Sequence, residues 1–186
     1  MTANTILTNP TQNSDIEFPQ NYTVIDIETT GLSNNYNEII ELSALKVRND
    51  EIVDKYSTLV KPKSKISTFI SKLTGITNEM VETAPFIENI LDKYIDFIGE
   101  DVVVGHNVRF DIGFINKKNI QCYDKEFTNK SIDTCKLSRK IAGLERHKLD
   151  YVANYYNIDT SGHHRAERDC IMTYGIYNAI KNDLSE

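Results

Sequence analysis

The segment 22–31 constrains the possible folds more than any other part of this sequence. It is a run rich in β-branched residues, Tyr-Thr-Val-Ile-Asp-Ile-Glu, which stops abruptly at Thr-Thr-Gly. Such a run predicts a β-strand, whose side chains point alternately to opposite faces. Asp26 and Glu28 therefore share one face of this strand, and Ile25 and Ile27 share the other.

The two neighbouring acids on one strand face indicate a binding site. Two carboxylates side by side repel each other, and burying even one is costly unless something neutralises its charge. Hard divalent cations prefer oxygen ligands, so a metal ion is the usual partner for such a pair. A strand face open to solvent would also tolerate acids, but the apolar residues around the pair weaken this alternative.

The composition is that of a soluble globular protein, since 40% of the 186 residues are hydrophobic and 26% are charged. We expect a flexible, polar N-terminal leader over residues 1–20 and a single domain over residues 21–186. The sequence shows neither an apolar run long enough for a membrane span nor a signal peptide. The sequence has three scattered cysteines, Cys122, Cys135 and Cys170. They argue against a disulfide framework or a zinc site and favour a location in the reducing cytoplasm.

The net charge of −6 excludes a protein that coats duplex DNA through a broad basic face. The acidic excess lies within residues 1–100, whereas residues 101–186 are nearly balanced. If several of the acids bind metal ions, the site itself changes sign and attracts phosphate. Local contacts to a few phosphates therefore remain compatible with this composition.

The order of predicted elements indicates an α/β fold. Alternating apolar residues predict an antiparallel three-strand meander at 22–28, 39–47 and 52–60, and a proline-containing loop at 61–65 ends it. A short buried strand is expected at 102–104 and a further strand at 131–133. Helical spacing and caps predict helices at 77–84, 85–99, 109–119, 134–141, 147–156 and 165–181. This order predicts a mixed sheet flanked by helices.

Two further acids could join the pair on the first strand. Asp111 follows a short buried strand, where functional residues gather in α/β sheets, but an Asp in a first helical turn is also favoured by the helix dipole. Asp169 lies on the apolar stripe of the last predicted helix and needs a partner there. His164 lies five residues earlier, in the loop that enters this helix, and its neighbour His163 leaves the choice between the two histidines open on physical grounds.

Four acids so arranged suggest two hard cations bridged by carboxylates, a geometry that suits phosphodiester hydrolysis. A histidine with an ordinary pKa near 6.5 is suited to accept the proton of the attacking water.

Three motifs resemble those of the DEDDh 3′→5′ exonucleases. They are Asp26-Ile-Glu-Thr-Thr-Gly-Leu32, His106-Asn-Val-Arg-Phe-Asp111 and His164-Arg-Ala-Glu-Arg-Asp169. Three motifs in the right order are specific, whereas any one alone would be weak. The segments 37–42 and 73–78 look closest to the proofreading exonuclease domain of PolC-type DNA polymerase III, and less close to the epsilon subunit, which has a histidine at the position of Thr74.

The resemblance implies an RNase H-like fold, two Mg²⁺ or Mn²⁺ ions, and His164 as the general base. The implied metal ligands are Asp26, Glu28, Asp111 and Asp169. The implied nucleotide-binding residues are those of the turn, Thr29, Thr30, Gly31 and Leu32, with Asn107 and Phe110 as further candidates. Phe110 could equally belong to the core, and Asp133 is expected to support the sheet edge rather than bind metal.

The implied function is removal of nucleotides from the 3′ end of single-stranded DNA, with release of nucleoside 5′-monophosphates, in proofreading or repair. The alternatives are an RNA 3′ exonuclease and a non-catalytic module that binds nucleic acid or docks on a polymerase. The expected partners are a 3′ single strand and a DNA polymerase, with no membrane. Two sets of cations could guide the strand: Lys61, Lys63 and Lys65, or Arg139, Lys140, Arg146 and Lys148. Such runs of charge are more often only solvated surface.

Overall fold

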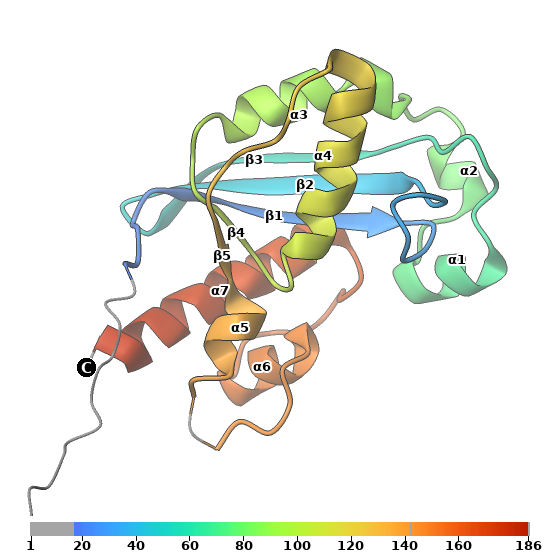
Figure 1. Cartoon of the computed structure of the whole chain (residues 1–186). Helices are drawn as coiled ribbons and strands as arrows, with labels where there is room; N and C mark the ends of the chain where they lie inside the picture. Colours follow the sequence, from blue (N-terminus) through green and yellow to red (C-terminus); the bar gives the residue numbers. More distant parts are fainter. Residues whose placement is uncertain (1–16, 142, 186) are drawn as a thin grey trace, which may run out of the picture.

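A five-stranded mixed sheet forms the centre of the protein (Figure 1). The computed structural model describes residues 17–141 and 143–185, so residues 1–16 of the predicted leader lie outside the described residues. The strand order is β3-β2-β1-β4-β5. The strands are β1 (Tyr22–Thr29), β2 (Ile39–Arg48), β3 (Glu51–Leu59), β4 (Val103–Gly105) and β5 (Ser131–Asp133).

The pairing of the strands confirms the predicted fold class. β1, β2 and β3 form an antiparallel meander, while β4 pairs parallel to β1 and β5 parallel to β4. The alternation predicted for β1 is also observed. Ile25 and Ile27 belong to the core cluster on one face of the sheet, and Val24 packs with Cys170 and Tyr177 on the other.

Helices cover both faces of this sheet (Figure 1). α3 (Leu91–Ile98) and α4 (Arg109–Tyr123) lie on one face, and α7 (Ala166–Ser185) lies across the other, accompanied by α5 (Thr134–Ser138) and α6 (Leu149–Tyr155). Phe18 and Pro19, from the range predicted as leader, contact Tyr177 of α7. The two rings lie 5.9 Å apart and the tyrosine hydroxyl donates a hydrogen bond to the Pro19 carbonyl.

Three helical segments differ clearly from the sequence prediction. The helix expected at 85–99 is interrupted at Ile90, whose φ of −138° separates the short η1 (Ile87–Asn89) from α3. An additional helix, α1 (Thr68–Thr74), was not predicted from the sequence; Ser67 caps its start and Gly75, which has a φ of 72°, caps its end. The neighbouring α2 (Asn78–Val81) begins at Thr77, as predicted, but is shorter than expected.

Asp133 supports the edge of the sheet, as predicted. Its Oδ1 accepts hydrogen bonds from the backbone N–H groups of Asn107, Cys135 and Lys136, so it caps α5 and fixes the chain that follows β4. None of the helices in the described ranges has the length and apolar character that crossing a membrane requires.

Candidate active site

Three of the predicted metal ligands meet at one end of β1. Asp26 and Glu28 lie on the face of β1 that α7 covers, and Asp169 lies in the first turn of α7. One carboxylate oxygen from each of these three residues lies within 4.8 Å of the others. The alternation of β1 and the position of Asp169 on the buried stripe of α7 together produce this convergence.

Asp111 lies beside this group, in the first turn of α4. It is only 4% exposed, and its Oδ1 accepts a hydrogen bond of 3.1 Å from the backbone N–H of Ile27 in β1. After burial, the negative charge of Asp111 contributes most to the raised pKa of Asp26. The structure thus brings all four predicted acids together.

Three of the four acids have no cationic side chain paired with them in the described part of the chain, and their pKa values are raised. Burial, and then the charges of Asp111, Asp169 and Glu28, raise the pKa of Asp26 well above its ordinary value. Burial and neighbouring acids likewise raise the pKa of Glu28 to about 8, and burial is the main cause that raises the pKa of Asp111 to about 8. Within the described residues no Lys or Arg forms an ion pair with Asp26, Glu28 or Asp111.

This chemistry fits divalent cations. Buried carboxylates that repel one another are stable in the ionised form only when a positive charge joins them, and their oxygens are the donors that Mg²⁺ and Mn²⁺ prefer. The donor set therefore agrees with the metal site expected from the sequence.

The two histidines stack on each other beside Asp169. Their ring centroids lie 3.8 Å apart, and His163 Nδ1 donates a hydrogen bond of 2.9 Å to Asp169 Oδ1. The same oxygen accepts a longer bond, 3.3 Å, from the backbone N–H of His164, which has a φ of 71°. The hydrogen bond to Asp169 raises the pKa of His163, whereas burial lowers the pKa of His164. The negative charge of Asp150, on α6, acts to raise the pKa of both histidines.

The predicted nucleotide-binding turn is held by its own polar groups. Thr29 donates its hydroxyl hydrogen to the Gly31 carbonyl, and Thr30 exchanges two hydrogen bonds with the backbone of Glu38. A side chain at Gly31 would meet Asn37, whose Nδ2 lies 2.7 Å from an added Cβ. This hydrogen-bonded turn leaves Leu32 89% exposed.

The other two candidates lie around the start of α4. Asn107 is exposed and has a φ of 63°, and its backbone is tied to Asp133. Phe110 is partly buried and packs on the core, with its ring 5.0 Å from that of Phe114. Phe110 therefore packs in the core, which was one of the two roles that the sequence left open. Part of its side chain remains accessible.

An ion pair that was not predicted from the sequence lies next to the acids. Glu41 of β2 is the antiparallel partner of Glu28, is 3% exposed, and accepts hydrogen bonds from Nε and Nη2 of Arg165. Two signals could have revealed it. Glu41 is the only charged residue between Ile39 and Leu45, and Arg165 directly follows His164.

Comparison with known proteins agrees with the geometry of this site. The family model RNase_T, described as Exonuclease, matches residues 23–177, so the chain belongs to this exonuclease family, whose members hydrolyse phosphodiester bonds. The predicted resemblance to PolC-type DNA polymerase III and to the epsilon subunit is confirmed by two relatives. One is DNA polymerase III PolC-type of Caldanaerobacter subterraneus subsp. tengcongensis, 41% identical over 177 residues, which are 95% of this chain. The other is the DNA polymerase III subunit epsilon of Aquifex aeolicus, 42% identical over 164 residues, which are 88% of this chain.

The coverage differs between these relatives. The match spans 81% of the epsilon subunit but only 13% of the PolC-type polymerase. Among solved structures, Exonuclease X in complex with 5′ overhanging duplex DNA superposes with a TM-score of 0.70 at 28% identity, covering 87% of this chain and 92% of that one. The nuclease domain of 3′hExo, a DEDDh family member bound to rAMP, gives 0.75 at 22% identity over 88% and 92%, and confirms the RNase H-like fold.

Proposed function

We propose that this chain hydrolyses phosphodiester bonds at the 3′ end of single-stranded DNA and releases nucleoside 5′-monophosphates. The observation that carries the proposal is the convergence of Asp26, Glu28 and Asp169 within 4.8 Å, with buried Asp111 beside them. The similarity to polymerase III proteins supports a role in proofreading or repair, with a DNA polymerase as partner and the cytoplasm as location.

The four carboxylates would hold two divalent cations, Mg²⁺ or Mn²⁺. Bound there, the cations would supply activation of a water and stabilisation of negative charge at the leaving 3′ oxygen. The protein positions these carboxylates on two rigid elements, β1 and α7, and on the first turn of α4. Their mutual repulsion favours binding of a cation, because binding removes the electrostatic cost of ionising them.

His164 is the residue we assign as general base. Its ring makes no hydrogen bond to the described residues, and burial keeps its pKa below the ordinary value, so it is neutral at pH 7 and can accept a proton. His163 is engaged with Asp169, which favours its protonated form. We therefore assign His163 a role in orienting Asp169 and the neighbouring ring.

The terminal nucleotide would bind over the turn from Thr29 to Leu32. The rigid backbone of Thr29, Thr30 and Gly31 would contact the sugar, and exposed Leu32 would pack against the base. Asn107 and the accessible part of Phe110 would complete the pocket on the α4 side.

Digestion of matched DNA and RNA oligonucleotides tests this proposal. Each strand is labelled at its 5′ end and incubated with the protein in Mg²⁺, Mn²⁺ or EDTA. Progressive shortening of the labelled DNA, only with a divalent ion, is the expected result. Preferential shortening of RNA would favour the alternative of an RNA exonuclease. A protein that shifts the strand in a gel and never shortens it would be a binding module, and the proposal would be wrong.

A further inference from the structure

A groove with a volume of about 670 Å³ lies between the loop from α5 to α6 and the start of α6. Its lining includes Arg139, which follows α5, and Arg146 and Lys148, which precede α6. None of the predicted metal ligands lines it, so the groove is separate from the acidic site.

Three cationic side chains line this groove in a protein whose net charge is −6. Arg139, Arg146 and Lys148 form no ion pair with any residue that the structure describes. Two acids, Glu145 and Asp150, also line the groove, which leaves an excess of cations. Unpaired cations of this kind are available to bind phosphate groups.

An aromatic ring lies among these cations. Tyr151 of α6 is 36% exposed, and the guanidinium of Arg146 lies 5.8 Å from the centre of its ring. A ring face next to cations is the combination that binds single-stranded nucleic acids, because bases stack on the ring and phosphates pair with the cations. The ring therefore favours a nucleotide over a simple anion as the ligand of this groove.

The groove adjoins the histidine side of the active site. His147, in its lining, accepts a hydrogen bond of 2.8 Å at its carbonyl from Nε2 of His106, which begins the segment that carries Asp111. Asp150, also in the lining, is the acid of α6 whose charge acts on His163 and His164. A strand that leaves the active site past the histidines would meet this groove.

We propose that this groove binds nucleotides on the 5′ side of the scissile bond, with phosphates on Arg139, Arg146 and Lys148 and a base on Tyr151. The proposal rests on the proposed function, since it assigns the path of the same polynucleotide substrate. It predicts that the groove contributes to the binding of long strands and not to the hydrolysis of a single nucleotide unit.

The test compares a long with a minimal substrate in the variants Arg146→Ala/Lys148→Ala and Tyr151→Ala. The long substrate is a single-stranded DNA oligonucleotide, and the minimal one is the p-nitrophenyl ester of thymidine 5′-monophosphate. For the oligonucleotide, the double variant should raise KM at least about tenfold and reduce the slope of log KM against log salt by about 0.7 per lost phosphate contact. Tyr151→Ala should raise the same KM at least about fivefold. The rate on the ester should not change.

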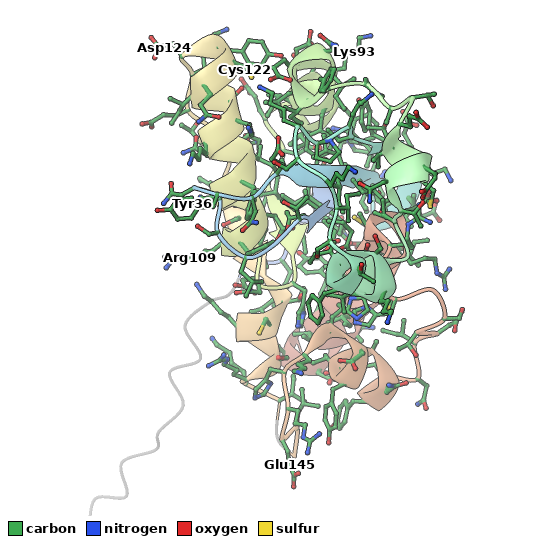
Figure 2. All side chains as sticks on the ribbon, turned by 90° about the vertical axis from the view of Figure 1, so that its right-hand side faces the viewer. Tyr36, Lys93, Arg109, Cys122, Asp124 and Glu145 are labelled. Atoms are coloured by element: carbon green, nitrogen blue, oxygen red, sulfur yellow. The ribbon has the colours of Figure 1, made fainter. Side chains whose placement is uncertain are left out.

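A matched control is Lys93→Ala/Lys125→Ala, which removes two cations from the opposite end of the molecule. Figure 2 shows Lys93 and Asp124, the neighbour of Lys125, at one end and Glu145 of the groove loop at the other. Circular dichroism and melting curves establish that each variant folds. Groove variants that match this control in KM and in salt dependence would overturn the proposal.

Binding without cleavage separates this proposal from the proposed function. Fluorescence anisotropy of a labelled oligonucleotide in EDTA measures affinity even if no substrate is hydrolysed. Weaker binding by the groove variants than by the control supports the groove, whether or not the chain is active. Equal affinity of both double variants refutes it, again independently of activity.

Discussion

The carboxylate of Glu41 and the guanidinium of Arg165 form a paired contact next to the acidic site, with the shortest N to O distance at 2.7 Å. Glu41 also accepts a hydrogen bond from the backbone N–H of Ala166, at 3.0 Å. The pair therefore fixes the first residue of α7 and the residue that follows His164. It also neutralises an acid that would otherwise add its charge to that of Glu28 across the two strands.

Loss of this pair should destabilise the protein through the buried acid. Arg165→Met leaves the Glu41 charge buried without a cation, and we expect a loss of about 2 kcal/mol. This is less than for a fully buried pair, because the Arg165 side chain is 41% exposed. Urea unfolding measures it. The double variant Glu41→Gln/Arg165→Met removes both charges and should recover part of the loss; a double variant less stable than Arg165→Met would contradict this account.

Asp26→Asn should abolish nuclease activity without loss of stability. The change removes the carboxylate that we propose as a metal ligand but keeps the shape of the side chain, and it removes a charge that burial and the neighbouring acids disfavour. We expect product below detection and a metal-free melting temperature equal to or above that of the unchanged protein. Asp124→Asn, at an exposed position after α4, is the control and should affect neither property.

Without divalent ions, the protein should lose stability as the pH rises from about 5 to 8. The folded-state pKa values of Glu28 and Asp111, about 8, lie above those of an unfolded chain, so the folded state binds more protons across this range. Stability then falls with increasing pH. Adding Mg²⁺ or Mn²⁺ at pH 8 should restore the melting temperature. A metal-free melting temperature that is constant or rises over this range would contradict the electrostatic description of the site.

His164→Ala should lower kcat by about 10²–10⁴-fold while the protein still binds Mn²⁺. Because burial lowers the pKa of His164, the rate should rise with pH and reach its plateau at a lower pH than an ordinary histidine would give. Steady-state kinetics across pH, together with Mn²⁺ titration by calorimetry, measure both effects. His163→Ala is the informative comparison: if it reduces kcat more than His164→Ala, the assignment of the base is wrong.

Leu32→Ala should weaken substrate binding without affecting the fold. The Leu32 side chain is 89% exposed, so its truncation removes almost no buried surface from the folded protein. A higher KM at an unchanged melting temperature is expected. Ile120→Ala, at a partly exposed position of α4, is the control; equal kinetics of the two variants would exclude Leu32 from the nucleotide pocket.

Local patterns in the sequence were sufficient for the sheet and for three of the acids, whereas Asp111 was assigned through the resemblance to the exonuclease motifs. The alternation in β1 placed Asp26 and Glu28 on one face, and the apolar stripe of the last helix directed Asp169 inward, because both depend on fixed side-chain periods. The helix α1 was missed because it has seven residues and depends on tertiary packing, through buried Ile70, and on its two caps.

Contacts between distant segments could not be predicted in this way. Glu41 and Arg165 are 124 residues apart in sequence, and no local pattern connects them. The ring of His163, rather than that of His164, bonds to Asp169, and the positive φ of His164, an uncommon backbone conformation, accompanies this arrangement.

The hydrogen bond between the Ile27 amide and Asp111 affects the choice of an inactive protein for trapping bound substrate. Replacing Asp111 by alanine would leave a main-chain donor of the central strand without its acceptor, and the resulting distortion would be recorded together with the ligand. Asp26, which accepts no such bond among the described residues, is the safer position to change. Crystals grown with that variant should preserve the native shape of the strand beneath the nucleotide.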